Sequence, residues 1–179
     1  MTKQDTSENQ AKNIYLGIGS NLGNRITNIE KAKSLLEEKN IKLISFSKYY
    51  ETPSWPNPKN PKFINIVLKT NCQIKPSKLL SICKSIEVKL GRKKAAKNSP
   101  RVCDIDIIDF NGLIINKDDL KIPHKKCHLR NFVLYPILQI DAEWVHPKIQ
   151  KNVKFLINNL DQKSRIEITR LNKNVIIKS

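Results

Sequence analysis

The stretch PRVCDIDIID, residues Pro100–Asp109, combines a strand-like run of Val, Ile and Cys with three carboxylates. Side chains alternate faces along a strand, so Asp104 and Asp106 point to one face while Ile105 and Ile107 point to the other. Carboxylates are depleted from strands, and burying an unpaired one is costly. The stretch therefore predicts a two-sided strand, with one face in the core and a charged face that needs cationic partners.

The segments on either side of this strand alternate between strand and helix patterns. Upstream, strand patterns cover residues 14–20, 41–50 and 62–72, and helical periods cover residues 26–39 and 76–91. Pro76 suits the first turn of the second helix, and Gly91 suits the position just past its end. Downstream, Asn111-Gly112 predicts a turn into a further strand that ends near Ile115. The order β-α-β-β-α-β-β predicts an α+β layer fold built on a largely antiparallel sheet.

The C-terminal third is less regular. Residues 131–140, NFVLYPILQI, read as an apolar segment broken by Pro136, and residues 146–160 predict a final helix. Trp144 is expected in the core and His146 in a turn with Pro147, whereas His128 is expected to be packed or solvated. The cysteines form no CxxC pair, which argues against zinc, and we expect buried thiols without disulfides; they are Cys72, Cys83, Cys103 and Cys127.

Length and composition predict one soluble domain. The chain has 179 residues, and we expect a disordered polar tail over residues 1–12 and a single domain over residues 13–179. No apolar run approaches the ~20 residues of a membrane span, and the N-terminus lacks a secretory h-region, so we expect a cytoplasmic protein. The net charge of +17 favours polyanionic ligands, but the lysines are scattered and no Arg-rich arm is present. We therefore expect phosphorylated small molecules rather than nucleic acid.

The Asp-x-Asp pair has a specific chemical use. Same-face neighbours on a strand lie roughly 6–7 Å apart at Cα, a gap that suits two Mg²⁺ ions about 3.5–4 Å apart. The alternative is a solvated pair without function. Arg92 and Arg101 lie upstream and can bind phosphate through bidentate forks, which favours a metal–polyphosphate site. We expect Asp109 to lie on the opposite face, near the turn and outside the site.

A second polar feature precedes the strand at residues 62–72. The stretch ETPSWPNPKNP contains four prolines and must be a stiff exposed loop, where Trp55 either anchors the loop or faces a ligand. On the following strand, Ile64 and its alternate neighbours are expected in the core. Phe63 and Asn65 then share the opposite face.

Three motifs in order connect these features to a known family. YLGIGSNLGNR, PRVCDIDIIDFNG and IPHKKCHLRNFVLYPILQI resemble the motifs of the 6-hydroxymethyl-7,8-dihydropterin pyrophosphokinases of folate biosynthesis, and the resemblance covers about residues 13 to 147. It implies a three-layer α/β/α domain with a ferredoxin-like core. It also implies Mg²⁺-dependent transfer of pyrophosphate from ATP to the pterin hydroxymethyl group, with AMP as the other product.

The resemblance assigns roles to individual residues. Asp104 and Asp106 would bind two Mg²⁺ ions, and Arg92 and Arg101 would be catalytic. The implied ATP-binding residues are Glu87, Ile107, Lys121, His124 and Arg130. The implied pterin pocket consists of Thr52, Pro53, Trp55, Phe63, Asn65 and Phe132. The implied partners are ATP and the pterin, with no nucleic acid or membrane, and we expect a monomer.

Some positions depart from the family pattern, and two other classes remain open. Asn98-Ser99 stands where the best-known bacterial members have Trp-Gly, and Trp55 could supply the missing contact over the pterin. Asp119 replaces a basic residue and Lys121 a small hydroxyl. A nucleotidyltransferase also combines Gly-Ser with Asp-x-Asp, although those elements are close together in that class. A basic RNA-binding domain would leave the Asp-x-Asp pair unexplained.

Overall fold

A computed structural model of the chain describes residues 13–93, 95–96 and 98–172; the tail expected over residues 1–12 lies outside them. The first half contains β1 (Ile14–Ser20), α1 (Arg25–Glu37), β2 (Lys42–Phe46), β3 (Tyr50–Thr52), β4 (Phe63–Asn71) and α2 (Pro76–Lys89). The second half contains β5 (Asp104–Phe110), β6 (Ile115–Asn116), β7 (Lys121–Ile122), a 3-10 turn (Cys127–Leu129), α3 (Asn131–Ile140), α4 (Val153–Asn158), α5 (Gln162–Ile166) and β8 (Thr169–Arg170).

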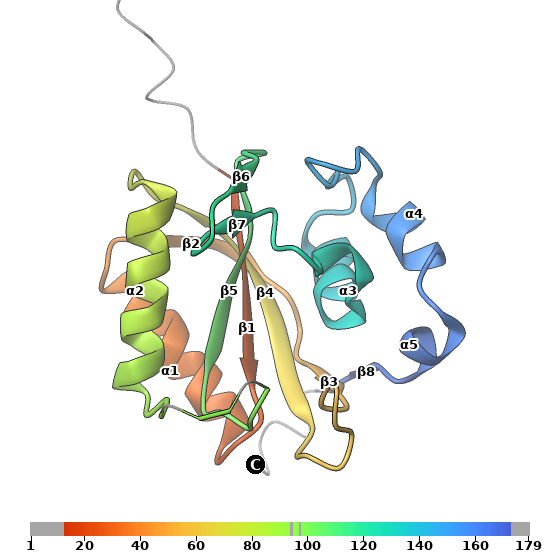
Figure 1. Ribbon diagram of the computed structural model, residues 1–179, viewed down its shortest axis with the longest axis horizontal. Coiled ribbons are helices and arrows are strands. Elements are labelled where there is room, and N and C mark those ends of the chain that lie inside the picture. The colour runs from red at the N-terminus through yellow and green to blue at the C-terminus, as the bar shows by residue number, and fades with distance from the viewer. Residues whose placement is uncertain (1–12, 94, 97, 173–179) are drawn as a thin grey trace, which may run out of the picture.

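The main sheet is antiparallel throughout. Its strand order is β5-β1-β4-β3-β8, and β2 pairs with β4 beside β3. Helices α1 and α2 cover one face, and α3 and α4 lie over the other (Figure 1). The order β1-α1-β2-β3-β4-α2-β5, with β1 and β4 at the centre of the sheet, confirms the predicted α+β class, its three layers and its ferredoxin-like core.

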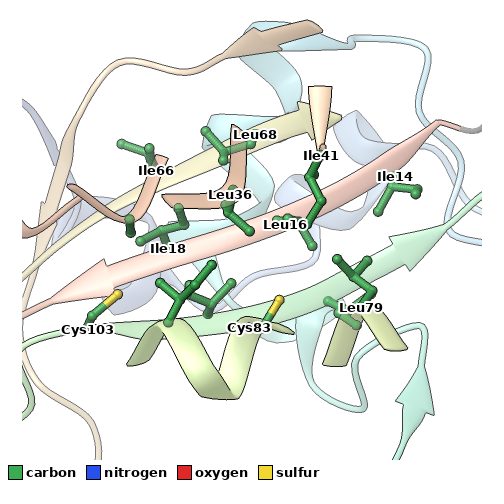
Figure 2. Close-up of a cluster of buried hydrophobic side chains, with 14 of the residues drawn as sticks. Ile14, Leu16, Ile18, Leu36, Ile41, Ile66, Leu68, Leu79, Cys83 and Cys103 are labelled. Carbon is green, nitrogen blue, oxygen red and sulfur yellow. The ribbon is translucent and has the colours of Figure 1, made fainter. Parts of the chain in front are cut away.

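The core between the sheet and α1 and α2 is almost entirely aliphatic (Figure 2). Ile105 and Ile107 lie in it, as the alternation along β5 predicts, together with Ile64 from β4. Full burial of each such side chain contributes about 1.5–3 kcal/mol, so this layer supplies much of the driving force for folding. A second core lies under α3, where Tyr15 and Trp144 pack edge to face.

Local residues bound both α1 and α2. Asn24 caps α1 by accepting a hydrogen bond from Thr27 N at 3.0 Å. Helix α2 begins at Pro76, and Gly91 follows its end with a φ of +101°, a conformation that glycine adopts without strain. The two helices are therefore bounded by local signals.

Four predicted elements differ in the structure. The helix expected over residues 146–160 is confined to α4, and turns occupy the residues before it. The strand expected over residues 41–50 is divided into β2 and β3, because Ser47 bonds Val67 of β4 while Lys48 N donates to Gln139 in α3. Helix α3 continues across Pro136, where packing of its buried apolar face outweighs the cost of a missing N–H. The strand expected up to residue 115 shrinks to β6, which pairs with β7 instead of β5.

The prediction for Asp109 was wrong about its face. A register shift between β1 and β5 pairs Tyr15 with Asp109 but Leu16 with Ile107, so Ile108 is an extra residue. The bulge turns Asp109 toward the α3 side, where its carboxylate accepts hydrogen bonds from Trp144 Nε1 at 2.9 Å and Gly112 N at 2.9 Å. Burial raises the pKa of Asp109, and these two donors oppose that effect. Asp109 is thus a buried structural carboxylate.

Other expectations for single residues agree with the structure. All four cysteines are buried, and no disulfide joins them in the part of the chain that is described. Trp144 is buried, and His146 accepts hydrogen bonds from the backbone of the turn that follows Pro147. Among residues 13–93, 95–96 and 98–172, no helix has the length and apolar character needed to cross a bilayer.

Candidate active site

A cavity of about 580 Å³ lies over the α3 side of the sheet, along β1, β4 and β5. Its walls come from the proline-rich loop between β3 and β4, the segment before β5, and the segment from residue 124 into α3. Eleven of the predicted site residues line it: Thr52, Pro53, Trp55, Phe63, Asn65, Arg101, Asp104, Asp106, His124, Arg130 and Phe132. The fold therefore brings together residues that are up to 80 positions apart.

Two glycines of β1 form the floor of the cavity. Gly19 pairs with Asp104 on one side and Asn65 on the other, and Gly17 pairs with Asp106. A Cβ atom on Gly19 would lie 2.8 Å from Asn65 Oδ1, so no other residue fits without displacement. Two inter-strand spacings separate Asp104 from Asn65, which places the carboxylate side and the amide side about 10 Å apart across a bare floor. The sequence signal for this floor is Gly-x-Gly within a strand.

The first carboxylate, Asp104, is held between two arginines. Arg92 Nη1 lies 2.8 Å from Asp104 Oδ1, and Arg101 Nη1 lies 3.2 Å from Asp104 Oδ2. Arg101 also donates through Nε to Ser99 O at 3.2 Å. The Asp104 side chain remains 25% exposed, so it is available to a ligand in the cavity.

The second carboxylate, Asp106, faces Arg130 and His124. Arg130 Nη1 lies 3.2 Å from Asp106 Oδ2, and His124 Nε2 lies 3.8 Å from the same oxygen. Burial lowers the pKa of His124, Asp106 opposes this, and Arg130 reinforces it. His124 Nδ1 accepts a hydrogen bond from Lys126 N at 3.2 Å, so a neutral ring carries its proton on Nε2, toward Asp106.

Glu87 supports this cluster from beneath. Its carboxylate accepts hydrogen bonds from Ile105 N at 2.7 Å and Lys84 Nζ at 3.0 Å, and it forms an ion pair with Arg92. Glu87 therefore joins α2 to β5 and orients the guanidinium that reaches Asp104. Glu87 and Arg92 lie behind the cavity wall, one contact away from the cavity.

The other end of the cavity combines an amide with aromatic rings. Asn65 Nδ2 donates to Thr52 Oγ1 at 3.1 Å, which fixes the orientation of the buried amide. Phe63 and Phe132 line the cavity from β4 and α3, and Arg130 Cζ lies 5.3 Å from the Phe132 ring centroid. This end suits a flat polar heterocycle that needs stacking surfaces and directed hydrogen bonds.

Asn21, which follows directly after β1, joins two walls of the cavity. Its Nδ2 donates to Ser54 Oγ at 3.2 Å and to Pro61 O at 3.1 Å, at the two ends of the proline-rich loop. Its Oδ1 accepts from Arg101 N at 2.7 Å, and its own N–H donates to Arg101 O at 3.1 Å. The buried amide thus fixes the loop on the aromatic side and the backbone of the cationic side together.

Besides Glu87 and Arg92, two more predicted residues do not line the cavity, and one wall was not predicted. Ile107 packs in the core under α1 and α2, and Lys121 Nζ bonds Asn116 Oδ1 and Lys117 O on the β6–β7 hairpin. Residues 161–167, around α5, line the cavity and are held by a hydrogen bond of 2.6 Å from Asn131 Nδ2 to Ser164 O. No local motif marks this wall, because long-range pairing positions it.

A Cys/His cluster lies outside the cavity. Ligand atoms of Cys127, His128 and His146 lie within 4.8 Å of one another, which is within reach of a shared metal. However, Lys148 N and Ile149 N both donate to His146 Nδ1 at 3.2 Å. A neutral His146 ring must then carry its proton on Nε2, so neither nitrogen offers a free lone pair. The cluster is therefore a packing feature.

His146 predicts a pH dependence of stability. Burial, reinforced by His128, lowers the pKa of His146 to about 4, whereas an unfolded histidine titrates near 6.5. The unfolded state therefore binds the proton first, and stability should fall by about 2–3 kcal/mol as pH falls from 6.5 to 4. The free energy of unfolding, measured by urea titration at several pH values across this range, should depend less on pH in His146→Asn. The Oδ1 of the asparagine can still accept the two backbone hydrogen bonds. The same pH dependence of stability in His146→Asn and the wild type would contradict the assignment of this effect to His146.

Comparison with known proteins identifies one family. The family model described as 7,8-dihydro-6-hydroxymethylpterin-pyrophosphokinase (HPPK) matches residues 15–142. The chain is 38% identical over 141 residues to the 2-amino-4-hydroxy-6-hydroxymethyldihydropteridine pyrophosphokinase of Aquifex aeolicus, covering 79% of this chain and 88% of the relative. It is 40% identical over 148 residues to the folic acid synthesis protein FOL1 of Dictyostelium discoideum, covering 82% of this chain.

The solved structures show the same fold at lower identity. Wild-type HPPK-DHPS of Plasmodium falciparum superimposes with a TM-score of 0.68 at 16% identity, over 92% of this chain. The chain spans 49% of that polypeptide and 22% of the Dictyostelium protein, so it corresponds to one part of these longer relatives.

Proposed function

The chain belongs to the 7,8-dihydro-6-hydroxymethylpterin-pyrophosphokinase family, and we propose that it transfers the β,γ-pyrophosphoryl group of ATP to 6-hydroxymethyl-7,8-dihydropterin in folate biosynthesis. The observation that carries the proposal is a cavity whose two ends differ in chemistry. An arginine-bound carboxylate pair lies at one end, and an aromatic pocket with a fixed amide lies at the other. One end suits a metal-bound polyphosphate and the other suits a pterin.

We propose that Asp104 and Asp106 hold two Mg²⁺ ions with ATP. Mg²⁺ prefers oxygen ligands and is often bound by one or two carboxylates together with phosphate oxygens. The two side chains fit this use, because they share one face of β5 and are 25% and 34% exposed to the cavity. Bound Mg²⁺ would supply charge neutralisation of the polyphosphate.

The arginines have a second use once a polyphosphate binds. Arg92, Arg101 and Arg130 all contact the carboxylate pair, and guanidinium forks match phosphate as well as carboxylate. We assign Arg92 and Arg101 to the transferring phosphates, and Arg130 with His124 to the rest of the ATP polyphosphate. Glu87 orients Arg92. Ile107 and Lys121 lie outside the cavity, so we assign them no contact with the phosphates.

The pterin end orients the second substrate. Phe63 and Phe132 provide stacking surfaces, and Asn65, held by Thr52, offers directed hydrogen bonds to a donor–acceptor edge. Pro53 and Trp55 close the pocket from the loop. Stacking and hydrogen bonding together hold the hydroxymethyl group toward the carboxylate pair, which lowers the entropic part of the barrier.

The covalent change balances without a further reactant. The hydroxymethyl oxygen forms a bond to the β-phosphorus of ATP, and the bond from this phosphorus to the α,β-bridging oxygen breaks. AMP leaves with that oxygen, and the hydroxyl proton is released. The protein contributes mainly positioning and electrostatic stabilisation, as is typical of phosphoryl transfer.

We further propose that the enzyme acts as a monomer in the cytoplasm. The residues assigned to both substrates line a cavity within one chain. The cytoplasm supplies ATP and Mg²⁺.

The test is the identity of the nucleotide product. With ATP, Mg²⁺ and 6-hydroxymethyl-7,8-dihydropterin, the protein should form AMP and the pterin diphosphate in equal amounts. EDTA should stop the reaction, and 6-methyl-7,8-dihydropterin, which lacks the attacking hydroxyl, should give no AMP. Formation of ADP would indicate transfer of a single phosphate, and release of pyrophosphate would indicate a nucleotidyltransferase; either result would overturn the proposal.

A further inference from the structure

Trp55 occupies an unusual position for a large aromatic residue. It lies on the proline-rich loop at the rim of the cavity, and 64% of its surface is exposed. Exposed aromatic surface at the mouth of a concave site is typical of a ligand contact. The other tryptophan, Trp144, is 5% exposed and bonded to Asp109, so it is a structural residue.

Hydrogen bonds fix the ends of this loop, whereas Trp55 is held by a different kind of contact. Ser54 Oγ donates to Pro61 O at 2.6 Å, and Asn21 bonds both residues, so the base of the loop is tied to β1. Lys126 Nζ lies 4.5 Å from the centroid of the Trp55 ring. This cation–π contact joins the loop to the opposite wall of the cavity.

Lys126 is itself connected to the carboxylate end. Its backbone N–H donates to His124 Nδ1 at 3.2 Å, and His124 Nε2 faces Asp106. One residue therefore touches the aromatic rim through its side chain and the histidine of the polyphosphate end through its backbone. Lys125, the preceding residue, is exposed and is not part of the cavity wall.

We propose that Lys126 is a positioning residue that holds Trp55 across the mouth of the pterin pocket. This inference rests on the proposed function. Lys126 orders the indole before the pterin arrives, so less conformational freedom is lost on binding. An exposed cation–π contact of about 0.5–1 kcal/mol corresponds to about a two- to fivefold change in affinity. Such a contact is strong enough to bias the loop and weak enough to open for exchange of substrate and product.

The test compares Lys126→Met with Lys125→Met, which removes the same charge one position away. Lys126→Met should raise KM for 6-hydroxymethyl-7,8-dihydropterin about two- to fivefold and leave kcat and KM for ATP unchanged. Lys126→Arg should restore the wild-type KM, because arginine also stacks on indole. Acrylamide should quench the fluorescence of Lys126→Met more strongly than that of the wild type, since Trp144 is buried in both.

The possible outcomes separate the inference from the proposed function. An unchanged pterin KM in Lys126→Met, an equal change in Lys125→Met, or a parallel rise in KM for ATP would each overturn the positioning role. If the wild-type protein forms no AMP, the proposed function fails and the inference fails with it. If the wild type is active and only the Lys126 comparison fails, the proposed function stands.

Discussion

Replacing Asp104 or Asp106 by asparagine is expected to lower the rate of AMP formation by about 10³-fold, because each carboxylate is assigned to the metal–polyphosphate site. The amide has nearly the same shape but lacks the negative charge that a Mg²⁺ ligand set requires. Both side chains face the cavity and are partly exposed, so neither substitution leaves a hole in the core. The rate should be measured at saturating ATP and Mg²⁺, with circular dichroism as the check on folding.

Asp109→Asn is a matched control on the same strand. Asp109 is 4% exposed and bonds Trp144 and Gly112, so its substitution should reduce stability but leave the kcat of folded protein near that of the wild type. If Asp104→Asn and Asp106→Asn retain full turnover, the metal assignment is wrong. If Asp109→Asn alone abolishes turnover in folded protein, the site has been placed on the wrong carboxylate.

Glu87→Ala is expected to destabilise the fold by about 1–3 kcal/mol, because it leaves the buried N–H of Ile105 without its hydrogen-bond acceptor. Glu87 is 1% exposed, accepts hydrogen bonds from Ile105 N and Lys84 Nζ, and forms an ion pair with Arg92. Ile105 lies on β5 between the two members of the carboxylate pair, so the lost hydrogen bond lies beside the proposed metal site. The free energy of unfolding from urea titration measures the effect.

Two control variants show how much of the lost stability comes from the buried hydrogen bonds and how much from removing a charge. Glu87→Gln keeps an acceptor for Ile105 N but removes the charge, so it should lose clearly less stability than Glu87→Ala. Glu38→Ala removes an exposed carboxylate that lies 3.9 Å from Lys89 of α2, and it should change stability by less than about 0.5 kcal/mol. Equal effects for Glu87→Ala and Glu38→Ala would show that the buried network does not stabilise the junction of α2 and β5.

The main architecture could be predicted from the sequence because its signals are local. Alternation along residues 104–107 placed the aspartates and isoleucines on opposite faces, and Pro76 with Gly91 bounded α2. The exceptions depend on partners distant in sequence. The bulge that turns Asp109 exists only in the register between β1 and β5, and α3 accepts Pro136 because the sheet packs against it.

The site shows the same difference between features that have local sequence signals and features that depend on distant contacts. The residues carried by the three motifs meet in one cavity because β4 and β5 flank β1, an arrangement that follows from the fold. The roles of Asn21 and Lys126 could not be predicted, since each depends on contacts between loops. The sequence carries a signal for the floor at Gly19, which is the Gly-x-Gly spacing. It carries no signal for the wall around α5, because an ordinary polar segment forms that wall.

The most direct test of the central claim follows the phosphorus atoms of ATP. The protein is incubated with Mg²⁺, 6-hydroxymethyl-7,8-dihydropterin and ATP labelled with ³²P at the β-phosphate, and the products are separated. The proposed transfer predicts that the label appears in the pterin product and that the AMP is unlabelled. Label found in ADP, with unlabelled pterin, would contradict the attack at the β-phosphorus and with it the assigned function of the cavity.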